Sequence, residues 1–360
     1  MKTEIMVALA ASILVAAYID TLVGVIIFFA AAIGLVFTKK TTGREAALAA
    51  VLFLIFIQTF FLYYQPAMQV ARGQGTVLSD NWWEALNWIN KNTAECAVVA
   101  TYWDPGHFIT GIARRAVVFD GASQSNLFVR PYNYTQAGLV VEKQDANINH
   151  IILYANGNKT TARIQDISTT LLSANETLAM EILKEYRKPG CDEMYYIASA
   201  DLIPKSTWWT YFSTWNPVDK RGTPYVYSSI QLGNSRQDPT HNAVIYSYPV
   251  SQQETFVIYA TNNTLLAFLQ QQGNSQPLKV EKYVYFDERG RGQLITQADA
   301  QIKGLMYIDP SFGSILFIPP ELENAMFTRM FLFNGAGLKN FEYVNNWGGE
   351  VKLYKVKFDS

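Results

Sequence analysis

The sequence predicts a membrane-anchored α/β (α+β) protein, and three observations lead to that prediction. The chain of 360 residues is 49% hydrophobic but only 16% charged, whereas typical soluble domains are about 25% charged. Its longest apolar runs all lie before residue 65. After residue 80, helical and strand patterns alternate, which favours a mixed sheet covered by helices.

The N-terminal stretch 5–37 is apolar apart from Asp20. A single helix of this length would reach about 50 Å, well beyond the roughly 30 Å hydrocarbon core of a bilayer. Two membrane helices, 5–18 and 21–37, therefore fit the stretch better. A single tilted span with an interfacial extension is the alternative.

A third membrane helix is expected at 46–64, where 19 residues carry no charge; roughly 20 are needed to cross a bilayer. The loop at 39–44 before it contains three basic residues, and basic loops stay on the cytoplasmic side. Residues 1–65 are therefore expected to form the membrane region, with residues 65–360 outside the cytoplasm.

The exterior part is expected to contain an α/β core with a β-rich insert. From about residue 241 the pattern changes to short apolar runs separated by turn residues such as Gly273-Asn274, which indicates strands. The helical pattern returns near the C-terminus and is followed by one strand. The expected segments are a linker at 66–79, a core at 80–240, an insert at 241–318, and a helix and strand at 319–360 that complete the core.

The stretch 81–124 is the most informative part of the chain. It indicates a helix capped by Asn81, a buried strand at 97–102, a tight turn, a second helix and a further strand. The turn contains Asp104-Pro105-Gly106, where Pro fixes φ and Gly is expected at positive φ. A carboxylate is thereby placed at the carboxyl end of a strand, where open α/β sheets bind ligands. A turn-capping aspartate beside a core tryptophan is the alternative.

This stretch resembles the C-terminal portion of the catalytic subunits of oligosaccharyltransferases, the archaeal-type dolichyl-phosphooligosaccharide–protein glycosyltransferases. The family signature Trp-Trp-Asp-Tyr-Gly stands here as Tyr102-Trp103-Asp104-Pro105-Gly106. Segments 181–186 and 326–355 also agree. The flanking helix and strand match at Trp83, Ala85, Leu86, Trp88, Ile89, Asn92, Thr93, Arg115, Val117 and Asp120.

The resemblance implies a binding site for the acceptor sequon Asn-x-Ser/Thr. In the family, the signature side chains hydrogen-bond the Ser/Thr hydroxyl two residues after the acceptor Asn. By position, that role falls on Tyr102, Trp103 and Asp104, with Pro105 and Gly106 completing the motif. A hydroxyl both donates to a carboxylate and accepts from an indole N–H, so the residue types suit it.

A second acceptor element is implied by the family pattern Asp-x-x-Lys-x-x-x-Met/Ile. The nearest match places Asp201, Lys205 and Trp209 in these positions, with one extra residue between Asp and Lys. Pro204 would start or kink a helix there. The alternative is that Asp201 caps that helix and Lys205 is a solvated turn residue.

The family holds its catalytic Mn or Mg ion with carboxylates, including an Asp-x-Asp pair, in an N-terminal multi-helix region. This sequence contains no Asp-x-Asp, so we expect no catalytic or metal residues in it and no transfer activity without that region. The resemblance thus implies the acceptor-recognition portion of an enzyme that transfers a lipid-linked oligosaccharide to Asn. A split gene, a fragment and a degenerate paralogue all fit.

The alternative function is a non-catalytic, membrane-anchored module that binds sequon peptides, and a coincidental turn in an unrelated envelope protein is a further one. A net charge of −1 gives no electrostatic case for nucleic acid. The expected partners are acceptor polypeptide, lipid-linked oligosaccharide and the bilayer. Cys96 and Cys191 each precede an expected strand, and whether they are bonded stays open because strand adjacency is unproven.

Overall fold

The computed structural model describes residues 59, 63–73, 78–133, 137–142, 148–261, 264–274, 276–287 and 291–358. It divides into two units, residues 1–78 and 79–360. The expected membrane helices at 5–18 and 21–37, and most of the one at 46–64, lie outside the described residues. Within the described part, no helix is long and apolar enough to cross a membrane.

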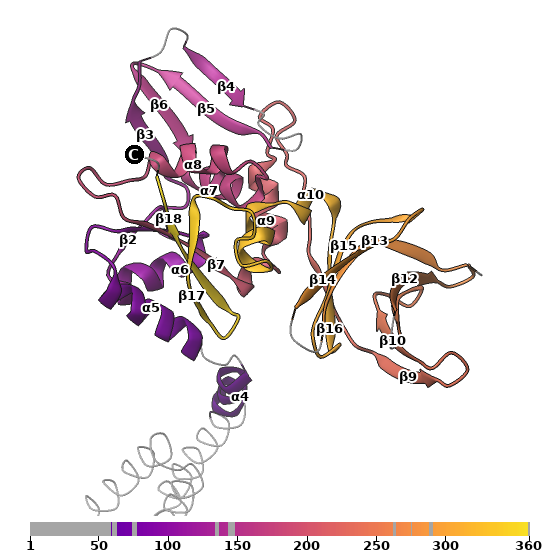
Figure 1. The fold of residues 1–360 in the computed structure, drawn as a ribbon. Coiled ribbons are helices and arrows are strands. Elements are labelled where there is room, and N and C mark those ends of the chain that lie inside the picture. Colours follow the sequence, from indigo (N-terminus) through magenta and orange to yellow (C-terminus); the bar gives the residue numbers. More distant parts are fainter. Residues whose placement is uncertain are drawn as a thin grey trace, which may run out of the picture. The chain divides into compact units, whose positions relative to one another are not determined.

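The first unit contributes one described helix, α4 (Gln65–Gly73), which carries Arg72 in its last turn (Figure 1). It occupies much of the segment 66–79 that the sequence analysis assigned to a linker. The second unit begins at Ser79 and holds all other elements described below.

A mixed sheet of five strands lies at the centre of the second unit, as expected for an α/β core (Figure 1). Its strands in spatial order are β17 (Phe341–Trp347), β18 (Val351–Val356), β7 (Met194–Ser199), β1 (Val98–Ala100) and β2 (Ala116–Val117). β1 runs parallel to both β2 and β7, whereas β18 is antiparallel to β7 and β17. The sequence analysis expected one C-terminal strand, and β17 is an additional one.

Helices accompany the sheets of this unit, and some of them pack on the central sheet. They are α5 (Asp80–Asn92), α6 (Trp103–Phe108), η2 (Ile109–Ala113), α7 (Arg163–Leu172), α8 (Glu176–Lys184), η3 (Ala200–Leu202), α9 (Ser206–Ser213), α10 (Pro320–Glu323) and α11 (Met326–Phe331). α5 contacts β17 and β18, and α11 contacts β7. The large apolar core joins β1, β7 and β18 to α7, α8 and α11.

The cap of α5 differs from the predicted one. Ser79 is the N-cap, and its side chain accepts from the backbone N–H of Trp82. Asn81, which was the predicted cap, is instead the second residue of α5. Its side-chain amide donates a hydrogen bond to the carboxylate of Glu350, at 2.9 Å. That partner lies 269 residues further along the chain, so the local sequence pattern could not reveal it.

The disulfide that the sequence left open is formed. Cys96 and Cys191 are bonded, with a sequence separation of 95 residues. They precede β1 and β7, which are parallel neighbours, so the bond joins the two strands at their amino ends. The opposite ends of the same strands lead to the predicted site residues.

A four-stranded antiparallel sheet follows β2, and the sequence analysis did not foresee it as a unit. Its strands are β3 (Leu127–Pro131), β6 (Asn158–Ala162), β5 (His150–Ala155) and β4 (Gly138–Glu142), in that spatial order. It lies over α7 and α8 in Figure 1. Phe128 of β3 stacks on Tyr186 at 4.3 Å between ring centroids, which anchors the sheet to the end of α8.

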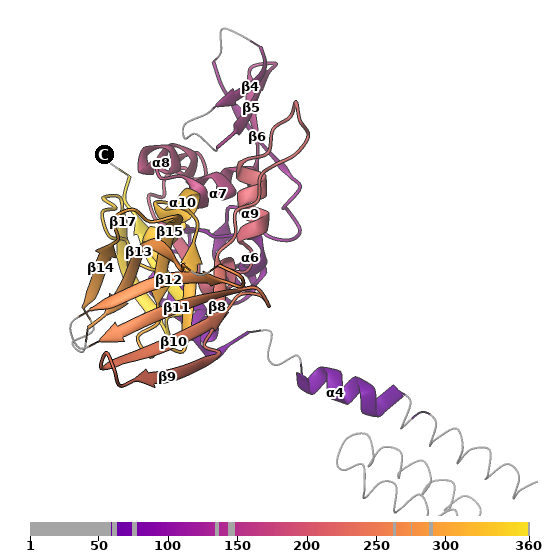
Figure 2. The same cartoon turned by 90° about the vertical axis from the view of Figure 1, so that its right-hand side faces the viewer.

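A third sheet, of nine strands, occupies residues 228–318 (Figure 2). Among the described residues of this sheet, one strand pair, between residues 280–284 and 302–307, is parallel and the others are antiparallel. Two strands precede residue 241, so the sheet begins before the predicted boundary. The strands are β8 (Ser228–Gln231), β9 (Asn234–Asp238), β10 (Ala243–Pro249), β11 (Glu254–Thr261), β12 (Leu265–Gln271), β13 (Leu278–Phe286), β14 (Gly292–Thr296), β15 (Ile302–Ile308) and β16 (Ser314–Ile318).

The nine-stranded sheet has its own apolar core around Tyr248, Tyr283 and Met306. Four further residues of the same sheet belong instead to the large core of the central sheet: Val284, Leu305, Leu316 and Ile318. The two sheets therefore share buried apolar surface.

Candidate functional site

The predicted site residues meet at the carboxyl edge of the central sheet. Since β1 and β7 are parallel neighbours, the segments that follow them leave the sheet at the same edge. Asp104 follows β1, and Asp201 and Lys205 follow β7. The topology thereby joins two motifs that are about 100 residues apart in the sequence.

The tight turn predicted after β1 is wrong, because a helix forms there instead. Trp103 begins helix α6, and Asp104 and Pro105 lie in its first turn, where proline is tolerated because the N–H has no helical partner. Gly106 is helical and not at positive φ. Glycine is needed because a Cβ there would lie 2.7 Å from both the Cβ of Asp120 and the carbonyl oxygen of Phe119.

Lys205 bridges the two motifs. Its Nζ lies 2.8 Å from Oδ2 of Asp104 and 2.7 Å from Oδ2 of Asp201. Asp201 in turn accepts a hydrogen bond from the hydroxyl of Ser199, the last residue of β7. Burial lowers the pKa of Lys205, but the bonds and charges of Asp104 and Asp201 outweigh it and raise that pKa. Lys205 is therefore a cation at neutral pH.

A cavity of about 320 Å³ opens beside this ion pair, and we call it the Asp104 cavity. Its walls combine aromatic and aliphatic side chains with the Asp104–Lys205 pair. The lining residues are Tyr102, Trp103, Asp104, Gln124, Ile164, Lys205, Trp208 and Phe212. An open apolar hollow with a few convergent polar groups is the usual form of a small ligand site.

Tyr102 is the most buried member of the lining, at 1% exposure. Its hydroxyl makes no hydrogen bond of standard geometry among the described residues, although the neighbouring Trp103 side chain lies close enough to lower its pKa. Burial and the nearby charge of Asp104 outweigh that effect and raise the pKa of this phenol, so the hydroxyl stays protonated at neutral pH. A buried donor that is poorly paired is costly, and a polar ligand in the cavity would relieve that cost.

The two adjacent tryptophans of the second motif point in opposite directions. Trp209, predicted to stand in the site, is fully buried and donates its indole N–H to the carbonyl of Leu202, 2.9 Å away. Trp208 is 59% exposed and lines the Asp104 cavity instead. The structure therefore places Trp209 in the core, packed on Phe327, and makes Trp208 the wall residue.

Two further residues of the resemblance have local structural partners. Arg115 is buried and donates to the carbonyls of Asn90 and Thr93, both at 2.7 Å, at the end of α5. Asp120 accepts from the backbone N–H and hydroxyl of Ser123, and the hydroxyl bond is the main cause that lowers its pKa. Asp120 thus shapes the turn that carries Gln124 into the cavity.

Three lining residues had no signal in the sequence. Gln124 lies in a turn, Ile164 on α7 and Phe212 on α9. Each comes from a different element, so only the packing of α7 against α9 and of the turn after β2 brings them together. Trp208 could have been found, because it stands next to the position to which the family pattern points.

The described residues do not form a metal site. No group of three His, Cys, Asp or Glu side chains comes together among them in a way that could hold an ion. The carboxylates nearest the Asp104 cavity share Lys205 as their counter-ion, so an ammonium group already lies where a divalent cation would need to bind. The Mn or Mg ion expected for the complete enzyme does not fit these residues.

The structure thus has a charged cavity at the carboxyl edge of parallel strands, which is where α/β proteins commonly bind ligands. No protein-family model matches the chain. It is 23% identical over 334 residues to a dolichyl-phosphooligosaccharide-protein glycotransferase of Methanocaldococcus jannaschii, covering 78% of this chain and 34% of the relative. The enzyme of the same name from Methanococcus voltae is 23% identical over 318 residues, covering 72% and 34%.

The resemblance to oligosaccharyltransferases that the motifs indicated is thereby confirmed, and this chain is a relative of those proteins. The chain spans about a third of the length of the curated relatives it matches. Among solved structures, the C-terminal domain of PglB from C. jejuni is similar with a TM-score of 0.42 and 10% sequence identity, covering 77% of this chain and 99% of that one.

Proposed function

We propose that this chain is the acceptor-recognition portion of an oligosaccharyltransferase. In that role it binds Asn-x-Ser/Thr polypeptides while a catalytic membrane region transfers a lipid-linked oligosaccharide to the Asn. The observation that carries the proposal is the ion pair of Asp104 and Lys205, which joins both acceptor motifs beside an open cavity. The similarity to the glycotransferases supports it.

The chemistry of the cavity suits a Ser/Thr hydroxyl. The carboxylate of Asp104 accepts a hydrogen bond, and the ammonium of Lys205 and the phenol of Tyr102 donate one. A hydroxyl group satisfies both kinds of partner at once. A site that hydrogen-bonds a hydroxyl also rejects ligands without it, because its own polar groups would be left unpaired.

The proposal assigns Tyr102, Trp103 and Asp104 to the sequon hydroxyl, with Lys205 and Asp201 as the second element. It replaces Trp209 by Trp208 as the apolar wall, because Trp208 is the one that lines the cavity. Pro105 and Gly106 act through the backbone of α6, since both are buried.

The setting of this function is also part of the proposal. Residues 1–65 anchor the chain in the bilayer and residues 65–360 lie outside the cytoplasm, as the apolar runs and basic loop predict. Lipid-linked oligosaccharide and the divalent Mn or Mg ion would be bound by the catalytic membrane region, as the resemblance to the family implies.

A paired binding and transfer assay tests the proposal. The full chain in detergent is titrated with a fluorescent Asn-x-Thr peptide and with the matched Asn-x-Ala peptide. Transfer is then measured with lipid-linked oligosaccharide, with and without a candidate N-terminal catalytic partner. We expect selective binding of the Thr peptide by the chain alone, and metal-dependent transfer only with the partner.

Each other outcome points elsewhere. Selective binding without transfer under any condition would favour the non-catalytic sequon-binding module. Equal binding of the Thr and Ala peptides would contradict the acceptor-recognition role. Transfer by the chain alone would require a catalytic centre that the proposal does not contain.

A further inference from the structure

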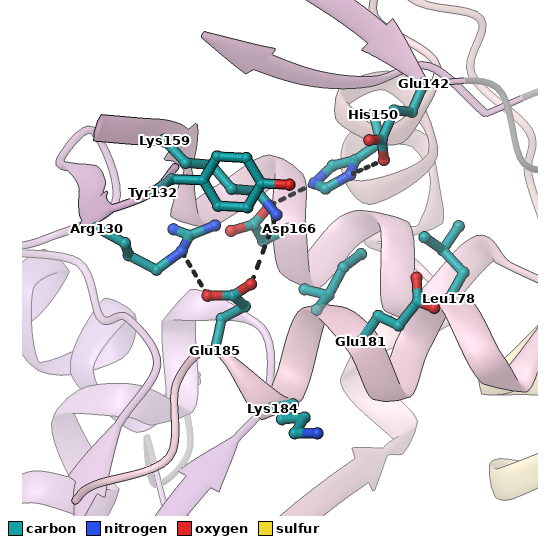
Figure 3. A pocket seen from close by; sticks show the side chains of 11 residues that line it. Arg130, Tyr132, Glu142, His150, Lys159, Asp166, Leu178, Glu181, Lys184 and Glu185 are labelled. Atoms are coloured by element: carbon teal, nitrogen blue, oxygen red, sulfur yellow. Dashed lines mark hydrogen bonds and ion pairs between the residues drawn. The ribbon is translucent and has the colours of Figure 1, made fainter. Parts of the chain in front are cut away.

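A second cavity lies between the four-stranded sheet and α8, on a different part of the fold from the Asp104 cavity. It measures about 440 Å³ and we call it the His150 pocket (Figure 3). Every strand of the four-stranded sheet supplies it with a charged side chain. These are Arg130 from β3, Glu142 from β4, His150 from β5 and Lys159 from β6.

The floor of the His150 pocket is a buried ion pair. Nε2 of His150 lies 2.6 Å from Oδ1 of Asp166, and both side chains are almost fully buried. Asp166 also accepts hydrogen bonds from the hydroxyls of Thr161 and Tyr186, at 2.6 and 2.5 Å. The carboxylate of Asp166 is therefore fully paired at the floor of the pocket.

His150 also positions a wall residue. Its Nδ1 lies 3.6 Å from Oε2 of Glu142. Burial lowers the pKa of His150, but the hydrogen bonds and charges of Asp166 and Glu142 raise it to about 9. The imidazole is therefore cationic at neutral pH and holds the carboxylate of Glu142 at the pocket wall, as Figure 3 shows.

The rim offers donors, acceptors and an aromatic face. Glu185 lies 2.8 Å from Nε of Arg130 and 3.5 Å from Nζ of Lys159. The same Nζ is 5.7 Å from the ring centroid of Tyr132, whose side chain is 45% exposed. The ring of Tyr132 also packs on Tyr154, at 5.1 Å between centroids. A ligand at the rim therefore meets two cations, a carboxylate and the exposed part of this ring.

The charges of the pocket cancel. Four cationic side chains, Arg130, Lys159, Lys184 and the protonated His150, line it together with four carboxylates, Glu142, Asp166, Glu181 and Glu185. A pocket with equal numbers of both signs favours neither an anion nor a cation. It favours a neutral ligand whose groups both donate and accept hydrogen bonds, which is the property of a hydroxyl.

We propose that the His150 pocket is a binding site for a neutral carbohydrate. Sugar hydroxyls would form hydrogen bonds with Glu142, Glu185 and Lys159. An apolar sugar face would pack against Tyr132, because aromatic side chains contribute strongly to binding energy. The volume falls within the usual range for small-molecule sites, roughly 300–1,000 Å³. This site goes beyond the proposed acceptor recognition and uses none of its residues.

Saturation-transfer-difference NMR on the full chain in detergent tests this site. The probes are maltose, cellobiose and chitobiose, and inorganic phosphate is added as an anionic competitor. We expect saturation transfer to at least one disaccharide. In Tyr132→Ala the dissociation constant should increase by roughly fivefold or more, because the ring contact is lost. The control Tyr343→Ala removes an equally exposed tyrosine, at 42%, from β17, and should bind as the parent does.

The outcomes separate this site from the acceptor site. Asp104→Ala should keep saccharide binding, and Tyr132→Ala should keep sequon-peptide binding, whether or not the acceptor proposal holds. A thermal melt of each variant checks that it is folded. Absence of transfer to all three disaccharides, equal binding by Tyr132→Ala and the parent, or displacement of the sugar by phosphate would each overturn the carbohydrate site.

Discussion

The two cavities use charge in opposite ways. In the Asp104 cavity, the side chains of Asp104, Lys205 and Asp201 are each about 30% exposed. In the His150 pocket, the side chains of His150 and Asp166 are 4% and 2% exposed. Ion pairs that solvent can reach contribute little stability, whereas a buried pair that loses one member leaves a costly charge. The first arrangement is therefore suited to meeting a ligand and the second to holding a framework.

The frameworks behind the two cavities differ as well. Behind the Asp104 cavity, β1 and β7 are joined by the Cys96–Cys191 disulfide and by apolar packing. Behind the His150 pocket, the sheet meets α7 through the buried His150–Asp166 pair. We therefore expect the first region to respond to loss of packing or of the disulfide, and the second to respond to pH.

The largest expected effect comes from the tryptophan behind the Asp104 cavity. Trp209→Ala should lower the free energy of unfolding by about 3–5 kcal/mol, because it empties a fully buried site. The matched variant Trp208→Ala should change it by only about 0.5 kcal/mol, since this side chain is exposed. Urea unfolding measures both. If Trp208→Ala were the more destabilising change, the assignment of wall and core would be reversed.

Removing the disulfide comes next. Cys96→Ser together with Cys191→Ser should cost about 2–4 kcal/mol of unfolding free energy, because the unfolded chain regains the freedom of a long loop. Chemical denaturation under oxidising conditions measures the loss. The pH response of the His150 pocket should persist in this double variant. An unchanged unfolding free energy would show that β1 and β7 need no covalent link.

The His150 pocket should make stability fall at alkaline pH. The pKa of His150 is raised to about 9 in the folded state, against about 6.5 when unfolded. Its contribution is therefore complete below about pH 6.5 and is lost as pH rises through 9, roughly 3 kcal/mol in total. The pKa of Asp166 is lowered chiefly by its bond to His150 against the opposing effect of burial, so its own contribution is lost only at acid pH.

Thermal melts between pH 6 and 10 on matched variants check this expectation. His150→Gln should flatten the alkaline fall and lower stability near neutral pH, because Asp166 then lacks its cation. His241→Gln is the control, since His241 is 69% exposed and pairs with Asp238 at the surface. If the melting temperature of the parent protein did not change between pH 7 and pH 10, the cationic state of His150 would be contradicted.

The smallest effect is the one that tests the ligand. Asp104→Ala and Trp103→Phe should each weaken use of an Asn-x-Thr acceptor by roughly 1–3 kcal/mol, the range for a lost buried or charged hydrogen bond. An acceptor with Ala at the third position should be poor for the parent and no worse for either variant. That missing further loss would tie the two residues to the same hydroxyl. Variants that still discriminate Thr from Ala as the parent does would make the motif purely structural.

The sequence predicted the elements whose signal is local. β1 lies within the strand expected at 97–102, and α5 forms where a helix was expected at the start of the stretch 81–124, because both have regular apolar patterns. β6 could not be predicted, because its sequence, Asn-Lys-Thr-Thr-Ala, is polar. It forms a strand because it pairs with β3 and β5. Gly106 was placed in a turn because Pro and Gly are turn signals, whereas its true constraint is a tertiary contact with Asp120.

The site was predictable to the same extent. The motif after β1 and the Asp201–Lys205 pair were visible in the sequence, and their meeting follows from parallel strands. The direction of the two tryptophans was not visible, because both lie on the short helix α9 and only packing decides which is buried. None of the His150 pocket could be foreseen, since its residues come from six elements or their ends.

The route of the chain through the four-stranded sheet bears on how such a protein could evolve. Leu127 and Ala162, the first and last residues of the sheet, are direct cross-strand partners, so the chain leaves and rejoins the core at one place. An excursion of this kind can be gained or shed by a short join across its neck. Loss of the sheet would leave the carboxylate of Asp166 buried in the interior without its partner His150. We therefore expect a lineage that lost the sheet to have replaced residue 166 as well. The two changes should occur together in related sequences.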